Sequence, residues 1–458
     1  MNIVILGAGQ VGRTAAQNLS SEENDITVVD RDAQLLQNLQ ERLDLRTVTG
    51  HGAHPDVLIE AGIEEADILL AVTNSDETNM VACQIAHLLF HTPTRLARIR
   101  SRDYLAHPNL FNARGFAVNY LISPEQLVTT FIHHLIEQPG ALQILDFFQG
   151  AAQLVACQVQ AGSAMAGRVL SHLPAQIPGV ETRLVALYRR GQVRIPEGTT
   201  VIEPEDEIFF LANSRDIETV IGAFRLSQSP YHKVMIVGGG NVGKQLAERL
   251  QGDRQVKIIE RDARRCRYLR ETLDPGTQVL QGNAGDTELL QTEDIAHTDV
   301  FCALTNNDED NILSATLAKR MGVRKTLALV NSPSYVDLVQ GEAIDIVVSP
   351  ALVIIGNLLT HIRRGDVEAV YSLRRGAAEA IELWVHGDET LSRVVGRPLD
   401  RLSLPPHASV GAILRQGRLI FPHHDERLEA EDRLVIFLAD KADIPAVERL
   451  FHVPLSFV

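Results

Sequence analysis

Short apolar runs alternate with segments of helical length along the first 124 residues of the chain. The apolar runs fall at 3–6, 26–30, 45–49, 68–72, 96–99 and 117–122. Strands separated in this way are typical of a parallel sheet with crossover helices. Because most of these runs are apolar along their whole length, we expect helices to cover both faces of the sheet.

The second half of the chain repeats the first. The sequence at 5–12, ILGAGQVG, returns at 236–243 as IVGGGNVG, and the sequence at 71–79, AVTNSDETN, returns at 303–311 as ALTNNDEDN. A third pair, GQVRIP at 191–196 and GRLIFP at 417–422, lies among several short apolar runs with few helical stretches, which is typical of small α+β domains. The predicted fold class is α/β, with two Rossmann-like doubly wound parallel-sheet domains, each followed by a small α+β domain.

The repeat predicts domains in the order A-B-A-B. A Ser-Pro pair at 123–124 and at 349–350 marks the start of a connecting helix after each Rossmann-like domain, because proline suits the first helical position after a serine cap. We predict Rossmann-like domains at 1–124 and 232–350, connecting helices at 125–142 and 351–368, and small domains at 143–227 and 369–453.

The first glycine motif has the context of a dinucleotide-binding loop. Gly7, Gly9 and Gly12 follow a predicted strand and precede a predicted helix, and Asp30 ends the next strand 18 residues after the motif. We expect free amides at the helix start to bind a pyrophosphate, and Asp30 to accept hydrogen bonds from the ribose hydroxyls. An acid there repels a 2′-phosphate, so NAD(H) is favoured over the NADP forms. The alternative is that the glycines only form a tight turn.

The second glycine motif repeats this arrangement with fewer cations. Glu260 follows the motif at 238–243 by 17 residues and takes the place of Asp30. Arg98 and Arg100 end a predicted strand where they can pair with phosphates, whereas Leu329 and Asn331 occupy the matching positions. We therefore predict tighter nucleotide binding in the first Rossmann-like domain, with a purely structural role for Arg98 as the alternative.

Two Thr-Asn pairs, Thr73-Asn74 and Thr305-Asn306, end the fourth predicted strand of each Rossmann-like domain. Their polar groups are placed to contact a nicotinamide or its ribose. The alternative is that each asparagine only caps the next helix, since a glutamate three residues later completes a capping-box spacing. His51 and His54 have Asn283 and Asp286 in their places in the second half, so we expect a loop role and no metal site.

The composition narrows the possible classes of partner. A net charge of −15 and a pI near 5.5 disfavour nucleic acid and anionic lipid, so we expect any membrane association to need a protein partner. The four cysteines lie far apart with no Cys-x-x-Cys, which argues against disulfides and suits a reducing cytoplasm. We expect no signal peptide, because the N-terminal residues lack a basic flank and a cleavage site and run directly into a predicted strand. We expect no membrane span, because no apolar stretch reaches the ~20 residues needed.

No catalytic motif for hydride transfer is present in the sequence. None of the seven tyrosines has a lysine four residues later, and the small domains hold no readable cluster of His, Asp and Lys. We predict that the protein is not an enzyme. The rival hypotheses are a soluble NAD-dependent oxidoreductase with a duplicated dinucleotide-binding domain, and a structural assembly protein whose glycine loops bind no nucleotide.

These motifs and their A-B-A-B order resemble the regulatory subunits of bacterial Trk potassium uptake systems. The resemblance includes ARIR at 97–100 and ISPEQ at 122–126, and it covers essentially the whole chain. It implies that the larger domains are RCK N-domains and the smaller ones RCK C-domains. It also implies NAD(H), together with ATP or ADP, as ligands.

The same resemblance implies a position and partners for the protein. We expect a peripheral protein on the cytoplasmic side of the inner membrane, assembled as a homo-oligomer, a tetramer by family, that controls a membrane-embedded potassium-translocating subunit of the TrkH or TrkG type. From the loops, their acids and the resemblance, the predicted cofactor-binding residues are Gly7, Ala8, Gly9, Gln10, Val11, Gly12, Asp30, Thr73, Asn74, Arg98 and Arg100 in the first half, and Gly238, Gly239, Gly240, Asn241, Val242, Gly243 and Glu260 in the second.

Overall fold

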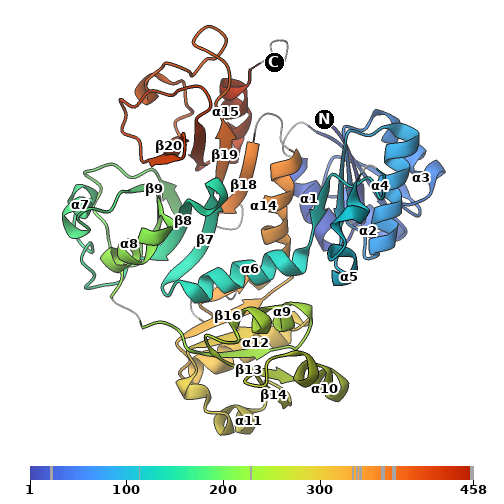
Figure 1. Ribbon diagram of the computed structural model, residues 1–458, viewed down its shortest axis with the longest axis horizontal. Helices are drawn as coiled ribbons and strands as arrows, with labels where there is room; N and C mark the ends of the chain where they lie inside the picture. Colours follow the sequence, from blue (N-terminus) through green and yellow to red (C-terminus); the bar gives the residue numbers. More distant parts are fainter. Residues whose placement is uncertain are drawn as a thin grey trace. The chain divides into compact units, whose positions relative to one another are not determined.

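The computed structural model contains four β-sheets, two parallel and two antiparallel (Figure 1). It describes residues 1–20, 24–112, 114–226, 229–332, 335–336, 339, 343–362, 367–373 and 378–453. Contacts divide the chain into two compact units. The first unit comprises Met1–Thr129, Leu329–Leu338 and Val348–Ile362, and the second comprises Thr130–Ala328, Val339–Val347 and Arg363–Val458.

The first parallel sheet has the strand order β3-β2-β1-β4-β5-β6, so the order reverses between β1 and β4. Ligands of wound sheets bind at such a reversal, beyond the carboxyl ends of the strands. The strands are β1 Asn2–Leu6, β2 Asp25–Asp30, β3 Arg46–Thr49, β4 Ile68–Ala71, β5 Thr94–Arg98 and β6 Tyr120–Ile122. The helices are α1 Gln10–Leu19, α2 Ala33–Gln40, α3 Pro55–Glu60, α4 Asp76–Phe90 and α5 Arg102–Leu105. The six predicted strands are confirmed, the last being shorter than expected.

The second parallel sheet repeats the first, with the order β14-β13-β12-β15-β16-β17. Its strands are β12 Lys233–Val237, β13 Gln255–Glu260, β14 Gln278–Gln281, β15 Val300–Ala303, β16 Lys325–Leu329 and β17 Ile346–Val348. Its helices are α9 Asn241–Leu250, α10 Ala263–Thr272, α11 Thr287–Thr292 and α12 Asp308–Arg320. The registers Ile68↔Thr94 and Val300↔Lys325 place Leu329 at the position of Arg98, as the sequence alignment predicts.

The two remaining sheets are antiparallel and five-stranded, with the orders β10-β9-β11-β8-β7 and β18-β19-β22-β20-β21. The first comprises β7 Ala141–Phe147, β8 Ala152–Gln158, β9 Thr182–Arg189, β10 Gln192–Arg194 and β11 Glu207–Asn213. The second comprises β18 Val367–Leu373, β19 Ala378–Trp384, β20 Ala408–Arg415, β21 Arg418–Ile420 and β22 Arg433–Leu438. The accompanying helices are α7 Leu173–Gln176, α8 Ile217–Phe224 and α15 Ile444–Phe451. The predicted duplicated α/β architecture is therefore present.

A helix follows each parallel sheet, α6 Pro124–Glu137 and α14 Pro350–Ile362. Both begin at the predicted proline. The first is shorter than predicted, because β7 begins at Ala141; of the second prediction, 351–368, residues 363–366 lie outside the described part of the chain. Within the first unit, α14 contacts α1 and β6, which belong to the other half of the sequence. Within the second unit, Arg249 at the end of α9 donates to Thr130 Oγ1 of α6 at 2.7 Å.

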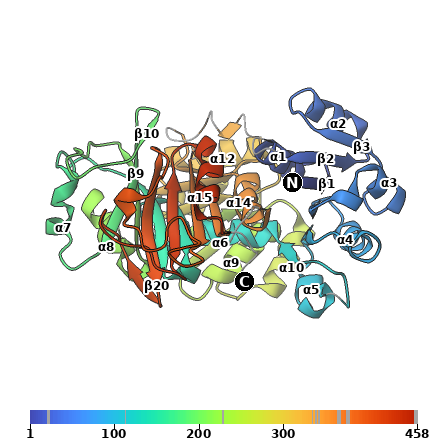
Figure 2. The same cartoon turned by 90° about the horizontal axis from the view of Figure 1, so that it is seen from above.

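The two antiparallel sheets share one hydrophobic core within the second unit, and β9 contacts β20 (Figure 2). Phe147 packs edge-on against Tyr371 with ring centroids 5.0 Å apart. The buried carboxylate of Glu382 accepts from the Phe148 amide at 2.9 Å and pairs with Arg433, while burial raises the pKa of Glu382. The repeat thus duplicates a small sheet and then packs the copies together.

Matching positions of the two copies meet in this shared core. Gly411 of β20 corresponds to Val185 of β9 at the repeat spacing. A Cβ atom at Gly411 would lie 2.8 Å from Val185 Cγ1 and 2.4 Å from Leu211 Cδ1, closer than packed carbons approach. One copy therefore supplies the large side chain and the other supplies the space for it.

We expect Gly411→Val to lower the free energy of unfolding by about 1–3 kcal/mol, the usual cost of overpacking a core. The double variant Gly411→Val with Val185→Gly should regain part of this loss, because it exchanges the large and small positions. Chemical denaturation checks both. Gly222→Ala in α8, where an added Cβ meets nothing within 4 Å, is the matched control. If Gly411→Val unfolds like the wild type, the two sheets do not pack in this way.

Candidate nucleotide-binding site

Each predicted glycine loop forms a tight turn between a strand and a helix. Gly7 adopts a φ of +106°, which favours glycine, and its amide donates to the Val29 carbonyl oxygen at 2.7 Å. A Cβ atom at Gly12 would lie 1.8 Å from the Gly7 carbonyl oxygen, so only glycine fits there. The second loop repeats this contact, with 2.0 Å between a Cβ at Gly243 and the Gly238 oxygen. Beside Gly9 and Gly240 an added Cβ meets nothing within 4 Å, which leaves open space in front of both loops.

The acid at the end of the second strand organises the loop. Asp30 accepts from the Ala8 amide at 2.6 Å through one oxygen and from the Asp32 amide at 2.9 Å through the other. Glu260 makes the same two bonds, to Gly239 at 2.8 Å and Asp262 at 2.9 Å. The longer side chain of Glu260 therefore reproduces the arrangement around Asp30, and the aspartate-to-glutamate change does not by itself distinguish the two clefts.

A buried asparagine fastens the chain after the fourth strand. Asn79 is fully buried, and its Oδ1 accepts from the Thr73 amide at 3.0 Å and lies 2.7 Å from Thr73 Oγ1. Its Nδ2 donates to the Arg98 carbonyl oxygen at 2.8 Å, which ties the end of β5 to the same turn. Asn311 forms the corresponding bonds with Thr305. The Thr73 hydroxyl thus serves the turn, in addition to lying at the cleft.

Each helix cap lies one residue later than the capping-box alternative predicts. The cap of α4 is Ser75, whose hydroxyl oxygen accepts from the Thr78 amide at 3.1 Å, and not Asn74. In the second half, Asn307 caps α12 by accepting from the Asp310 amide. The Thr-Asn pair belongs to the turn before the helix. The bonds between Thr73 and Asn79 keep Asn74 in that turn, so the helix cap falls at the next residue.

The first loop, the acid and the Thr-Asn turn surround one cleft with a volume of about 790 Å³. Of the predicted residues, those on its wall are Gly7, Gly9, Gln10, Val11, Asp30, Thr73, Asn74 and Arg98. Ala8, Gly12 and Arg100 are not on the wall; Ala8 and Gly12 shape the loop, and Arg100 donates to the Asn74 carbonyl oxygen at 3.3 Å.

Arg98 is the principal cation of the first cleft at its β5 edge. Its Nε is buried without a hydrogen-bond partner, and so is Oε2 of Glu125 at the start of α6. Desolvation lowers the pKa of Arg98, while the nearby Glu125 carboxylate raises it. A half-buried guanidinium with an unused donor on the wall of a cleft suits an anionic ligand.

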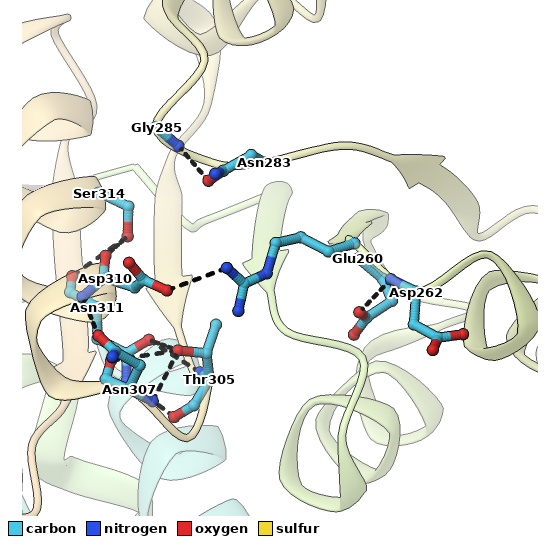
Figure 3. Close-up of polar contacts among 10 residues, drawn as sticks. Glu260, Asp262, Asn283, Gly285, Thr305, Asn307, Asp310, Asn311 and Ser314 are labelled. Atoms are coloured by element: carbon cyan, nitrogen blue, oxygen red, sulfur yellow. Dashed lines mark hydrogen bonds and ion pairs between the residues drawn. The ribbon is translucent and has the colours of Figure 1, made fainter.

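The second cleft is smaller, with a volume of about 410 Å³. Gly238, Gly240, Glu260, Thr305 and Asn306 are on its wall, whereas Gly239, Asn241, Val242 and Gly243 are not. Figure 3 shows Glu260 and Asp262 on one side and Asp310 with Asn311 on the other; of these four residues, Glu260 and Asp310 line the cleft. Arg261 forms an ion pair with Asp310 at 3.4 Å.

Several residues of the clefts were missed by the sequence analysis. In the first they include Arg31, Thr78 and His51, and in the second Arg261 and Asp310. His51 stacks on His54, and desolvation lowers the pKa of His51. Arg31 and Arg261 directly follow the two acids, and Asn79 and Asn311 end the repeated nine-residue motif. A residue-by-residue comparison of the two halves could therefore have identified both pairs as residues of the sites.

No helix in the described part of the chain is long and apolar enough to cross a membrane. Among the same described residues, no group of three or more His, Cys, Asp or Glu side chains is placed to hold a metal ion. All four cysteines are buried and free.

Family models match both kinds of domain. The TrkA-N domain model matches residues 3–124 and 234–350, the two parallel-sheet regions, and the TrkA-C domain model matches 154–225 and 390–452. Together they cover most of the chain. The chain belongs to the TrkA family of Trk potassium uptake proteins. The family resemblance inferred from the glycine loops and the A-B-A-B order is confirmed.

Full-length relatives of the TrkA family agree with this assignment. The chain is 52% identical over 457 residues to "Trk system potassium uptake protein TrkA" of Halomonas elongata, covering 100% of both chains. It is 50% identical to the protein of the same name in Vibrio alginolyticus, covering 99% of both.

Solved structures share the fold at low sequence identity. The GsuK RCK domain superposes with a TM-score of 0.62 at 19% identity, covering 98% of this chain and 94% of that one. The GsuK channel bound to NAD has a TM-score of 0.59 at 19% identity, covering 98% and 78%. The RCK-like fold is therefore shared along nearly the whole chain.

We expect Asn79→Ala to lower the free energy of unfolding by about 1–3 kcal/mol, because the partly buried Thr73 amide loses its acceptor. Asn311→Ala should act similarly in the second sheet. Chemical denaturation measures both variants, and exposed Asn74→Ala is the control, for which we expect little change. Wild-type stability of both buried-asparagine variants would contradict the structural role assigned to this side chain.

Proposed function

We propose that the protein is a nucleotide-sensing regulatory subunit of a potassium uptake system, which binds NAD(H), and ATP or ADP, and controls a membrane-embedded potassium-translocating subunit of the TrkH or TrkG type. The observation that carries the proposal is the duplicated cleft. Each half of a TrkA-family chain joins a glycine loop, an acid that holds the loop, and a fastened Thr-Asn turn at the reversal of a parallel sheet.

The ligand class follows from the chemistry of the first cleft. Free amides at the start of α1 and the guanidinium of Arg98 suit phosphates, and Asp30 keeps acceptor capacity for ribose hydroxyls beyond its two amide bonds. A 2′-phosphate beside Asp30 would be repelled, which favours NAD(H) over the NADP forms. The GsuK channel that shares this fold is described as bound to NAD.

The first cleft is proposed to bind nucleotide more tightly than the second. It is the larger of the two, and its wall has Arg98 where the second half has Leu329. The second cleft also carries Asp310 where the first has Thr78. Asp310 repels phosphate and occupies Arg261, the cation that follows the loop-holding acid. Charge, cavity volume and this ion pair therefore all favour tighter nucleotide binding in the first cleft.

Regulation is proposed to work by a shift in populations. A nucleotide changes the conformation of a protein only if it binds one arrangement better than another. The helices α6 and α14 are suited to transmit such a difference, because each directly follows the last strand of a nucleotide-binding sheet. The protein is proposed to act as a homo-oligomer, a tetramer, peripheral on the cytoplasmic side of the inner membrane and held there by its protein partner.

Calorimetry tests this function. Purified protein titrated with NADH, NAD, ADP and ATP should bind without turnover, and the stoichiometry per chain counts the working clefts. Repeating the titrations with the detergent-solubilised membrane subunit should change at least one affinity, because coupling between two sites is reciprocal. Failure to bind any of the four nucleotides would refute nucleotide sensing, and identical affinities with and without the subunit would refute the coupling.

Exchanging Thr78 and Asp310, which occupy matching positions in the two halves, tests which cleft binds nucleotide more tightly. We expect Asp310→Thr to raise NADH affinity at the second cleft about fivefold, which corresponds to ~1 kcal/mol, the upper range for an exposed ion pair. Thr78→Asp should weaken the first cleft by a similar factor. Glu309→Thr, one residue from Asp310 and absent from the cleft wall, is the control for net charge. A second cleft that already binds NADH as tightly as the first in the wild type would overturn the ranking.

A further inference from the structure

A third pocket lies within the second unit, away from both glycine loops. Its wall includes Gly140 before β7, Arg225 after α8, Tyr231 before β12, Arg324 and Lys325 at the start of β16, and Asp345, and its volume is about 660 Å³. Three of these residues are cationic and one is acidic. A cationic pocket is unexpected in a chain whose net charge is −15.

Part of this charge is balanced by neighbouring side chains. Arg324 pairs with Asp299 at 2.8 Å and lies over the ring of Tyr231. Asp345 pairs with Lys319 at 2.8 Å and accepts from the Thr326 amide. These four charged groups therefore neutralise one another in pairs.

Lys325 and Arg225 are not balanced in this way. Lys325 is only 8% exposed, and its ammonium donates to one carbonyl oxygen, that of Ala141, at 3.3 Å. Arg225 donates through Nη1 to the Gln158 carbonyl oxygen at 3.0 Å, but its Nε is buried without a partner. Among the residues that the structure describes, no carboxylate forms an ion pair with either cation. Burying the Lys325 ammonium is costly unless it gains an anionic partner.

The parallel-sheet fold itself does not require Lys325. The first parallel sheet has Thr94 at the position of Lys325 and Pro93 at the position of Arg324, since the two strand registers correspond. Both strands begin with the same type of backbone bond, from Thr94 to Asp67 and from Lys325 to Asp299. One copy thus forms the strand without a buried lysine, so Lys325 is not needed to start the strand.

We propose that this pocket binds a phosphate-class oxyanion, either free phosphate or the phosphate group of a small metabolite, between Lys325 and Arg225. The two cations come from different segments, the end of α8 and the start of β16. A bound oxyanion would accept the unused hydrogen bonds of both and join the first small domain to the second parallel sheet. This site is separate from the nucleotide clefts and does not depend on the proposed function.

Phosphate binding to the full-length protein tests the proposal. Inorganic phosphate and ribose 5-phosphate are titrated by calorimetry with and without saturating NADH, so that phosphate binding at the glycine loops is recognised by its competition with NADH. We expect one NADH-insensitive site per chain, and a phosphate-dependent rise in the unfolding temperature. Tighter binding of ribose 5-phosphate would identify a metabolite's phosphate group as the better ligand, and tighter binding of phosphate the free ion.

Two variants assign the site. Lys325→Met and Arg225→Gln should each weaken the NADH-insensitive phosphate binding at least tenfold and remove the rise in unfolding temperature. Lys257→Met, a lysine of the same sheet whose ammonium pairs with Glu293 at 2.9 Å, is the matched control and should bind phosphate like the wild type. Circular dichroism checks that each variant is folded. No NADH-insensitive binding in the wild type, or wild-type binding by both pocket variants, would overturn the proposal.

Discussion

Both parallel-sheet domains depend on the contact between the first and third glycines of their loops. A single added carbon at Gly12 or Gly243 would lie 1.8 or 2.0 Å from a carbonyl oxygen, far closer than non-bonded atoms approach. Without that carbon, the helix packs directly beside the strand it follows. The amides at the start of α1 and α9 then face the crevice at the reversal of strand order, where a ligand of this fold binds. The positions of the acid and of the Thr-Asn turn around the cleft follow from this contact.

The acids after the loops have a structural task that precedes any ligand. Each carboxylate receives two backbone amides, one from the glycine loop and one from the turn after its own strand. A fixed carboxylate presents its remaining lone pairs in a constant direction, which is a condition for selective binding of a ribose. Asp30 and Glu260 differ in length but achieve the same arrangement, so selectivity between the clefts has to come from other residues.

The two halves of the chain differ where they pack together and at their clefts. In the shared core of the small sheets, Val185 fills the space that its counterpart Gly411 leaves open. In the clefts, Thr78 of the first half corresponds to Asp310 of the second, and Arg98 corresponds to Leu329. At the start of β16, Lys325 introduces a charge that the first half lacks. Each change uses the freedom that a second copy of the same scaffold provides.

The sequence by itself determined the class of fold, the duplication, the family and the position of the glycine loops. These features are encoded locally, because a glycine at positive φ, an apolar run of strand length and an acid at the end of the next strand act over a few residues. The helix cap at Ser75 lies one residue after its predicted place, since the hydrogen bond that Asn79 Oδ1 accepts from the Thr73 amide decides where the turn ends.

Only the tertiary structure decided which distant segments meet. The contact of α14 with α1, the common core of the two small sheets, the Arg261–Asp310 pair and the pocket at Lys325 join residues from tens to hundreds of positions apart. No local pattern specifies such pairs, because their stability depends on side-chain shape and charge after the chain has folded. The sequence therefore determined the two glycine loops, and the packing of their surroundings gave the two clefts different volumes.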